Sequence, residues 1–158
     1  SPADALTANS LAIVALTLGC IFYGRLIDSL GSGPTFVLGS LLLAGATYAF
    51  YHGLAAGMDQ LVPLYMLAGF AVGIVGAVPY VMVNAFPPVV RFSGLSFSYN
   101  VAYAIFGGLT PMLVTLWMKN DVLAPSHYVV SLAGLGFVLG LWLWLRQRTR
   151  RQVTPQTA

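Results

Sequence analysis

FPPVVRFSGLSFSYNVAYAIFGGLTP, residues 86–111, is a stretch in which a proline-rich loop holding Arg91 runs directly into a long apolar segment. Polar residues interrupt that segment, namely Ser96, Ser98, Tyr99, Asn100 and Tyr103. The pair Gly107-Gly108 and then Pro111 follow, and these residue types weaken helices. Polar and helix-weakening residues are costly inside a membrane span, so their concentration here indicates a substrate pathway or a moving part.

The composition of the whole chain indicates that its solvent is lipid. Hydrophobic residues make up 58% of the 158 residues and charged residues only 7%, whereas a soluble domain typically carries about 25% charged residues. Eleven charged side chains, seven basic and four acidic, cannot cover a soluble globule of this size. This argues against a very apolar soluble helical protein. At about 20 residues per span, the chain has room for roughly five membrane spans and short loops.

The charged residues divide the chain into five long uncharged runs, and each run predicts one transmembrane helix. The predicted spans are residues 5–27, 34–53, 61–83, 93–117 and 128–145. The predicted fold class is therefore all-α, a polytopic bundle of five spans. Residues 1–145 would form this bundle and residues 146–158 a basic tail.

Basic residues gather at alternate ends of the predicted spans. Six arginines lie at or just after the ends of the first, third and fifth spans: Arg25, Arg91, Arg146, Arg148, Arg150 and Arg151. The other side holds Lys119 beside three acidic residues, Asp4, Asp59 and Asp121. The positive-inside rule then predicts an external N-terminus and a cytoplasmic C-terminal tail. The tail could also be interpreted as nucleic-acid binding, but its position after the last span favours a cytoplasmic stop that contacts anionic lipid.

The residue types needed for catalysis or metal binding do not gather in this chain. Cys20 stands alone inside a predicted span, and His52 and His127 lie at the outer ends of spans without ligand spacing. The sequence contains no glutamate, no catalytic triad order and no phosphate-cradling loop. We therefore expect neither an enzyme nor a cofactor or metal site.

Small residues recur at helical spacing in two spans, Gly69, Gly73 and Gly76 in the third and Gly136 and Gly140 in the fifth. Glycines at these intervals predict close contact between helices in lipid. Pro79 lies inside the third span and should weaken it, because proline lacks an N–H donor and clashes with the preceding turn.

The fourth span carries a polar stripe. Ser96, Asn100, Tyr103 and Gly107 follow one another at intervals of four, three and four residues, which places them on one helix face, with Tyr99 at its edge. Two interpretations remain open. The stripe lines a hydrated cavity, or its polar groups hydrogen-bond to neighbouring helices and hold the bundle together.

Two motifs resemble those of known transporters. GRLIDSLG, residues 24–31, is similar to the G-x-L-x-D-x-x-G loop of the major facilitator superfamily. FPPVVRFSGLSFSYN followed by AIFGGLTP resembles the region of helices ten and eleven in its metabolite:proton symporter family, which includes proline/betaine, α-ketoglutarate, shikimate and citrate carriers. The resemblance implies that the chain corresponds to helices 8–12 of a twelve-helix carrier, whose N-terminal half would be its partner.

The same resemblance implies roles for individual residues. Arg25, Asp28 and Arg91 would sit at the cytoplasmic gate, or else serve only as topology anchors. Ser96, Tyr99, Asn100 and Tyr103 would line the substrate cavity, with Asn9 and Thr17 of the first span as weaker candidates. The sequence departs from the family where Asn84 and Ala85 precede FP, since an acidic residue is frequent there. A gate network built on that carboxylate would be altered.

The function implied is secondary active transport by alternating access, proton-coupled, in a bacterial inner membrane. The substrate would be a small polar or anionic metabolite of the organic acid, betaine or amino acid class, with no nucleic acid as partner. No aspartate, glutamate or histidine lies in the middle of a predicted span, so the coupling group is expected outside this chain. The alternative is a truncated, non-transporting membrane remnant or a helix–helix interaction module. The coding sequence upstream distinguishes the two.

Overall fold

The computed structural model describes residues 2–57 and 61–153 of the chain. These residues form α-helices and short irregular helical turns, and no strand occurs among them. The α-helices are α1 (Pro2–Leu30), α2 (Ser32–Ala55), α3 (Val62–Val72), α4 (Val78–Ala85), α5 (Arg91–Ala102), α6 (Gly108–Met118) and α7 (Ala124–Val153). The turns between them are η1 (Gly73–Ala77), η2 (Pro88–Val90) and η3 (Tyr103–Gly107).

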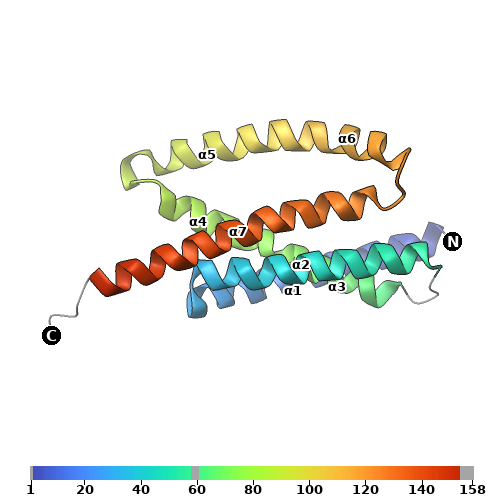
Figure 1. Cartoon of the computed structure of the whole chain (residues 1–158), viewed down its shortest axis with the longest axis horizontal. Coiled ribbons are helices and arrows are strands. Elements are labelled where there is room, and N and C mark those ends of the chain that lie inside the picture. The colour runs from blue at the N-terminus through green and yellow to red at the C-terminus, as the bar shows by residue number, and fades with distance from the viewer. Residues whose placement is uncertain (1, 58–60, 154–158) are drawn as a thin grey trace.

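These elements join into five long helical rods, shown in Figure 1. Each is long and apolar enough to cross a membrane: Asp4–Leu30, Ser32–Ala55, Val62–Ala85, Pro88–Met118 and Ala124–Thr149. The prediction of an all-α protein with five spans is confirmed. The helices extend past the predicted spans, and α7 continues without a break into the predicted basic tail. The arginines at the end of the fifth predicted span therefore do not end the helix.

The core of the bundle lies among α1, α2 and the third rod. Tyr23, Ile27, Phe36, Ile74 and Ala77 form a buried cluster there. The glycine contacts are confirmed. A Cβ on any of three third-rod glycines would lie within 3.4 Å of α1 atoms, and one on either α7 glycine would approach α2 equally closely: Gly69, Gly73 and Gly76, and Gly136 and Gly140. Close approach of backbones is how helices gain van der Waals contact in lipid.

Two rods are irregular where the sequence predicts weakness. The third rod tightens into the 3-10 turn η1 directly before Pro79, which occupies the first turn of α4. The fourth rod widens into the π-helical turn η3 before Pro111. Proline removes one backbone donor and clashes with the carbonyl four residues earlier, so the preceding turn changes its pitch. The predicted weakening of the third span is therefore a local change of helix type.

The segment predicted to be a loop, residues 24–31, is mostly helical. α1 continues through Leu30, and only Gly31 makes the turn into α2, with a φ of 88°. Glycine adopts this left-handed conformation without a steric cost, whereas other residues do not. Arg25 and Asp28 are therefore carried on the last two turns of a rigid helix, which corrects their placement in a loop.

The fourth rod stands apart from the others (Figure 1). None of the residues in its most apolar window is buried, against 39% in α2. It meets its neighbours mainly where α6 touches α7 and where α5 follows α4. The span that carries the polar stripe is thus the least packed part of the described chain.

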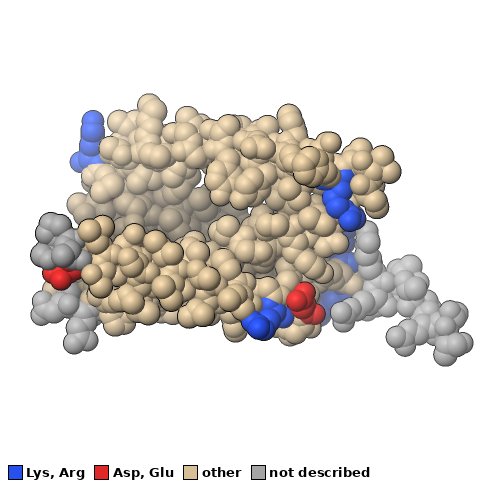
Figure 2. Space-filling view, turned by 180° about the vertical axis from the view of Figure 1, so that it is seen from behind, with Lys and Arg blue, Asp and Glu red and all other residues tan. Residues whose placement is uncertain are grey.

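Charged side chains mark the two ends of the rods. The ends of α1, α4 and α7 lie together at one end in Figure 1, which therefore holds Arg25, Arg91, Arg146 and Arg148, and we call it the arginine end. Figure 2 shows most of the visible basic atoms at this end. The opposite end holds Asp4, Lys119 and Asp121. Asp59 lies outside the described residues, as do the side chains of Arg150 and Arg151.

Candidate functional site

The polar stripe of the fourth rod forms two local pairs. The Tyr99 hydroxyl donates a hydrogen bond to the Tyr103 hydroxyl at 3.2 Å, and their ring centroids are 4.7 Å apart. Asn100 Nδ2 donates to the Ser96 carbonyl at 2.8 Å. Both pairs join residues one helical turn apart, so none of these bonds ties the fourth rod to another rod. Tyr99, Asn100 and Tyr103 are exposed, and no other rod of the described chain takes up their remaining hydrogen-bonding capacity.

Asn9 lies in a different place, beside a cavity of about 290 Å³ between α1, α2 and α3. The Tyr65 hydroxyl donates a hydrogen bond to Asn9 Oδ1 at 2.9 Å. Thr47 and Tyr51 also line this cavity, and Phe50 stacks on Tyr65 at 5.0 Å between centroids. Sequence reasoning found Asn9 but missed its partners. Aromatic residues near both ends of the second and third spans were the available signal.

Thr17 does not share that cavity. Its hydroxyl donates to the Ile13 carbonyl at 3.0 Å, one turn back on α1, and the side chain is exposed. Among the described residues, α1 makes no substantial contact with α5, η3 or α6. The predicted cavity residues therefore fall into separate groups, one on α1 and one on the fourth rod.

The three predicted gate residues share the arginine end but form no cluster. Arg25 and Asp28 are exposed on the last turns of α1. Arg91 begins α5, where its Nε donates a long hydrogen bond of 3.4 Å to the Phe86 carbonyl. No ion pair joins any of the three within the described parts of the chain. Their charges are available to groups from outside this bundle.

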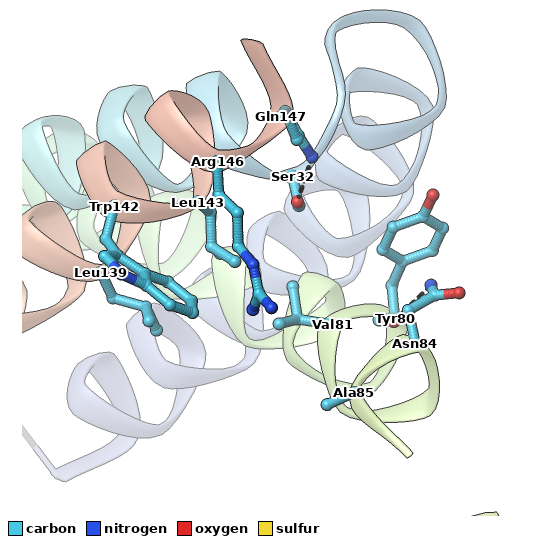
Figure 3. Close-up of a pocket in the computed structure, with 10 residues that line it drawn as sticks. All are labelled: Ser32, Tyr80, Val81, Asn84, Ala85, Leu139, Trp142, Leu143, Arg146 and Gln147. Atoms are coloured by element: carbon cyan, nitrogen blue, oxygen red, sulfur yellow. Dashed lines mark hydrogen bonds between the residues drawn. The ribbon is translucent and has the colours of Figure 1, made fainter. Parts of the chain in front are cut away.

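A larger cavity, of about 580 Å³, opens at the arginine end between α4 and α7 (Figure 3). Ten residues line it: Ser32, Tyr80, Val81, Asn84, Ala85, Leu139, Trp142, Leu143, Arg146 and Gln147. Gln147 Nε2 donates to the Ser32 hydroxyl at 2.7 Å. In Figure 3 the Arg146 guanidinium points across the cavity toward Val81. Sequence analysis assigned Arg146 to the tail, so its position in a cavity wall is a finding of the structure.

Electrostatics in this cavity are one-sided. Arg146 Cζ lies 5.1 Å from the centroid of the Trp142 ring, a cation–π contact. Neither a carboxylate among the lining residues nor an ion pair of Arg146 occurs in the described chain. Asn84 Nδ2 donates a hydrogen bond to the Tyr80 carbonyl at 2.8 Å. The cavity thus presents an unpaired cation and amide groups to whatever fills it.

A third, almost wholly apolar cavity of about 610 Å³ lies between the fourth rod and α7. Tyr103, Phe106 and Gly107 line it from one side and Tyr128 and Leu132 from the other. At this cavity Thr110 Oγ1 and the Tyr128 hydroxyl are 2.6 Å apart, a hydrogen bond between the rods. Two members of the polar stripe, Tyr103 and Gly107, therefore face α7. No group of three or more metal-ligating side chains occurs among residues 2–57 and 61–153.

Comparison of the sequence with curated proteins indicates the class of protein to which this chain is related. The chain is similar to bacterial membrane transporters, and its relatives carry the names of transporters and not of enzymes. Together with the five apolar helices, this identifies an integral membrane protein related to transport proteins and points to a non-enzyme.

The individual relatives carry related names. The chain is 27% identical to the proline/betaine transporter of Salmonella typhimurium over 83% of its own length and 28% of that protein. It is 29% identical to a glycine betaine/proline/ectoine/pipecolic acid transporter of Dickeya dadantii over 84% of its length. A Staphylococcus aureus protein, also named for proline/betaine transport, is 25% identical over 90% of the chain.

The chain spans only 28–32% of the length of these curated relatives. No family model matches the chain. No solved structure matches it either.

Proposed function

We propose that this chain is the C-terminal part of a major facilitator carrier of the metabolite:proton symporter type, corresponding to its helices 8–12. The observation that carries the proposal is the similarity of most of the chain to transporters named for proline and betaine. Support comes from the five apolar rods and from the GRLIDSLG and FPPVVRFSGLSFSYN motifs. The substrate would be a small polar or anionic metabolite of the organic acid, betaine or amino acid class.

The carrier would work by alternating access, with this bundle rocking against a second bundle around a site near the membrane midplane. Tyr99, Asn100 and Tyr103, with Ser96, would contribute polar groups to that site from the fourth rod. Asn9 would contribute from α1, with Thr17 in a lesser role. The exposed hydroxyl and amide groups of the stripe support this assignment, because no other rod satisfies them within the described chain.

The arginine end would be cytoplasmic and the opposite end external, in accord with the positive-inside rule. Arg25, Asp28 and Arg91 would then stand at the cytoplasmic gate and meet charges of the second bundle. Their lack of ion-pair partners in the described part of this chain supports that role. Residues 146–158 would form a basic segment that contacts anionic lipid headgroups. Proton coupling would use a titratable group outside this chain.

The test uses the full-length carrier in cells that lack their own betaine and proline uptake systems. We expect uptake of labelled glycine betaine or proline, and a thermal shift of the purified carrier that grows with ligand occupancy. Asn100→Ala and Tyr103→Phe should lower uptake or apparent affinity, whereas Phe97→Ala, on another face of the same rod, should not. If both polar variants transport like wild type, the stripe does not line the site.

A non-transporting membrane module is a second candidate. Gly107 and Gly108 of the fourth rod have open space around them, which favours it, because a partner helix could approach closely there. The upstream coding sequence distinguishes the two functions: seven further spans would support the carrier, and a start codon directly upstream would support the module.

A further inference from the structure

The cavity beside Asn9, of about 290 Å³, lies among α1, α2 and α3 at the end of the molecule opposite the arginine end. α1 begins, α2 ends and α3 begins there (Figure 1). Tyr51 of α2 and Tyr65 of α3 line this cavity together with Asn9 of α1, and we call it the tyrosine pocket. None of its described lining residues belongs to the fourth rod. The tyrosine pocket is therefore separate from the polar stripe.

The walls of the tyrosine pocket are held in place by contacts between the helices of this chain. Gly69 of α3 lines the pocket, and a Cβ on this residue would clash with the Ala12 carbonyl oxygen of α1. Phe50 of α2 stacks on Tyr65 of α3, with ring centroids 5.0 Å apart and an angle of 19° between the rings. The pocket is thus formed before any ligand enters, as small-molecule sites usually are.

Thr47 is a buried polar residue of this pocket whose hydroxyl has no partner in the described chain. The residue is 5% exposed and makes no hydrogen bond there. A threonine hydroxyl in a helix can bond to the carbonyl four residues earlier, and Thr17, Thr35 and Thr115 do so here. A buried hydroxyl without a partner costs free energy in an apolar environment. Thr47 therefore favours an occupant that carries a hydrogen-bonding group.

The other groups of the pocket define the charge of this occupant. Asn9 Oδ1 accepts the Tyr65 hydroxyl at 2.9 Å, which leaves the Asn9 amide hydrogens without a partner in the described chain. None of the described lining residues is charged. An ion in an apolar site needs a counter-charge, so the pocket suits an uncharged molecule. An acyl chain offers Thr47 no hydrogen-bonding group, and water leaves the ring walls without a packing partner.

The size and the walls of the tyrosine pocket suit one aromatic ring. An apolar cavity of about 150 Å³ holds benzene, so the volume here leaves room for a ring with a polar substituent. The rings of Phe50 and Tyr51 meet edge to face, with 5.3 Å between their centroids and 75° between their planes. Aromatic rings prefer edge-to-face and offset-stacked contacts, and these walls offer both kinds of ring surface to a further ring.

We propose that the tyrosine pocket binds a small uncharged phenol or aromatic alcohol, at a site separate from that of the transported metabolite. The ligand hydroxyl would accept a hydrogen bond from Asn9 Nδ2 and donate one to the Thr47 hydroxyl. Its ring would pack against Phe50 and Tyr51. A ligand held in this way joins α1 to α2 and stabilises the folded bundle. The inference goes beyond the proposed function, because binding requires neither the fourth rod nor transport.

Photolabelling of the full-length protein in native membranes tests the proposal. The probe is benzyl alcohol with a trifluoromethyl diazirine on its ring. We expect saturable labelling of peptides from α1, α2 and α3, which excess benzyl alcohol reduces several-fold. Thr47→Val should weaken binding about two- to tenfold, the loss of one uncharged hydrogen bond, and Thr47→Ser should not. Thr115→Val is the matched control, since this threonine is exposed on α6 and bonds within its own helix.

Thr47→Val should fold, because it removes an unpartnered hydroxyl with little change in volume, and thermal unfolding checks this. Labelling that does not saturate and spreads over all five rods, as for a probe dissolved in lipid, overturns the proposal. Equal labelling of wild type and Thr47→Val does so too. Competition by benzoate as strong as by benzyl alcohol would contradict an uncharged ligand. Competition by glycine betaine or proline would assign the pocket to the transported substrate instead.

Labelling and uptake are independent measurements. A protein that is labelled in the tyrosine pocket but takes up no substrate would contradict only the proposed function. A protein that transports without such labelling would contradict only the binding site.

Discussion

The α2–α7 pair and the fourth rod are built from similar apolar sequences, but α2 and α7 pack closely on each other, whereas the fourth rod makes few contacts. α2 and α7 meet along much of their length, with glycines letting the backbones approach. The fourth rod has Gly107 and Gly108 as well, yet nothing lies within 4 Å of a Cβ placed on either. In lipid, apolarity does not drive helices together, so packing depends on whether a complementary surface is present. The fourth rod lacks such a surface within the described chain.

The largest expected difference in folding comes from replacing one glycine of α2 and one glycine of the fourth rod by leucine. Gly33→Leu should abolish the folded bundle, because its Cβ would lie 2.5 Å from the Trp144 backbone nitrogen of α7. Gly108→Leu has open space and should leave folding unchanged in residues 1–158. Gel filtration in mild detergent reports the folded fraction. Equal behaviour of the two variants would contradict the distinction.

Truncating a phenylalanine on each side should give the next largest difference. Phe36 of α2 is 7% exposed and belongs to the buried cluster, whereas Phe97 of α5 is 73% exposed. Phe36→Ala should lower the free energy of unfolding by about 3 kcal/mol through lost packing. Phe97→Ala should change it by less than about 0.5 kcal/mol. Unfolding in mixed detergent and SDS measures both, and a similar loss for Phe97→Ala would show that the fourth rod is packed.

Removing a buried hydroxyl should have a smaller effect on the free energy of unfolding, and it should stabilise the protein. Tyr23 is 1% exposed, and its hydroxyl is buried without a hydrogen-bond partner. Tyr23→Phe should therefore raise the free energy of unfolding by about 1 kcal/mol, because an unsatisfied buried polar group is removed. Tyr99→Phe, on the exposed stripe, is the control and should be neutral in the same assay. A destabilised Tyr23→Phe would mean that this hydroxyl has a partner in the membrane.

The smallest expected effect concerns the one side-chain hydrogen bond that joins the fourth rod to α7 in the described chain. Thr110→Val and Tyr128→Phe each remove half of the 2.6 Å bond. A double-mutant cycle should give a coupling energy of about 0.6 kcal/mol, the average for such bonds in membrane helices. A coupling energy near zero would show that the two rods are not held together here.

Much of the fold was predictable because membrane spans are encoded locally. Long uncharged runs set the number of helices, and the arginines marked one end of the rods. The glycine spacings predicted contacts that the structure places against α1 and α2. Helix ends were less predictable, since Arg25 and Asp28 lie within the last turns of α1 and do not terminate it.

The candidate site was predictable only in part. Helical periodicity gathers Ser96, Asn100, Tyr103 and Gly107 on one face, but it gives no information on which neighbour that face meets. Asn9 is hydrogen-bonded to Tyr65, and Thr110 is hydrogen-bonded to Tyr128. In each pair the two residues belong to different rods and are more than fifteen residues apart in the sequence. Such pairings depend on the arrangement of the rods.

The sequence by itself determined that this chain is a five-span helical membrane protein with one arginine-rich end, because each of these properties depends on residues close together in the chain. The tertiary structure alone decided that α2 packs on α7 and α1 on α3, and that Arg146 faces a cavity. It also decided that the fourth rod stands apart from the other rods. The physical reason is that lipid accepts every apolar face equally, so only the shapes and polar groups of neighbouring helices select which faces meet.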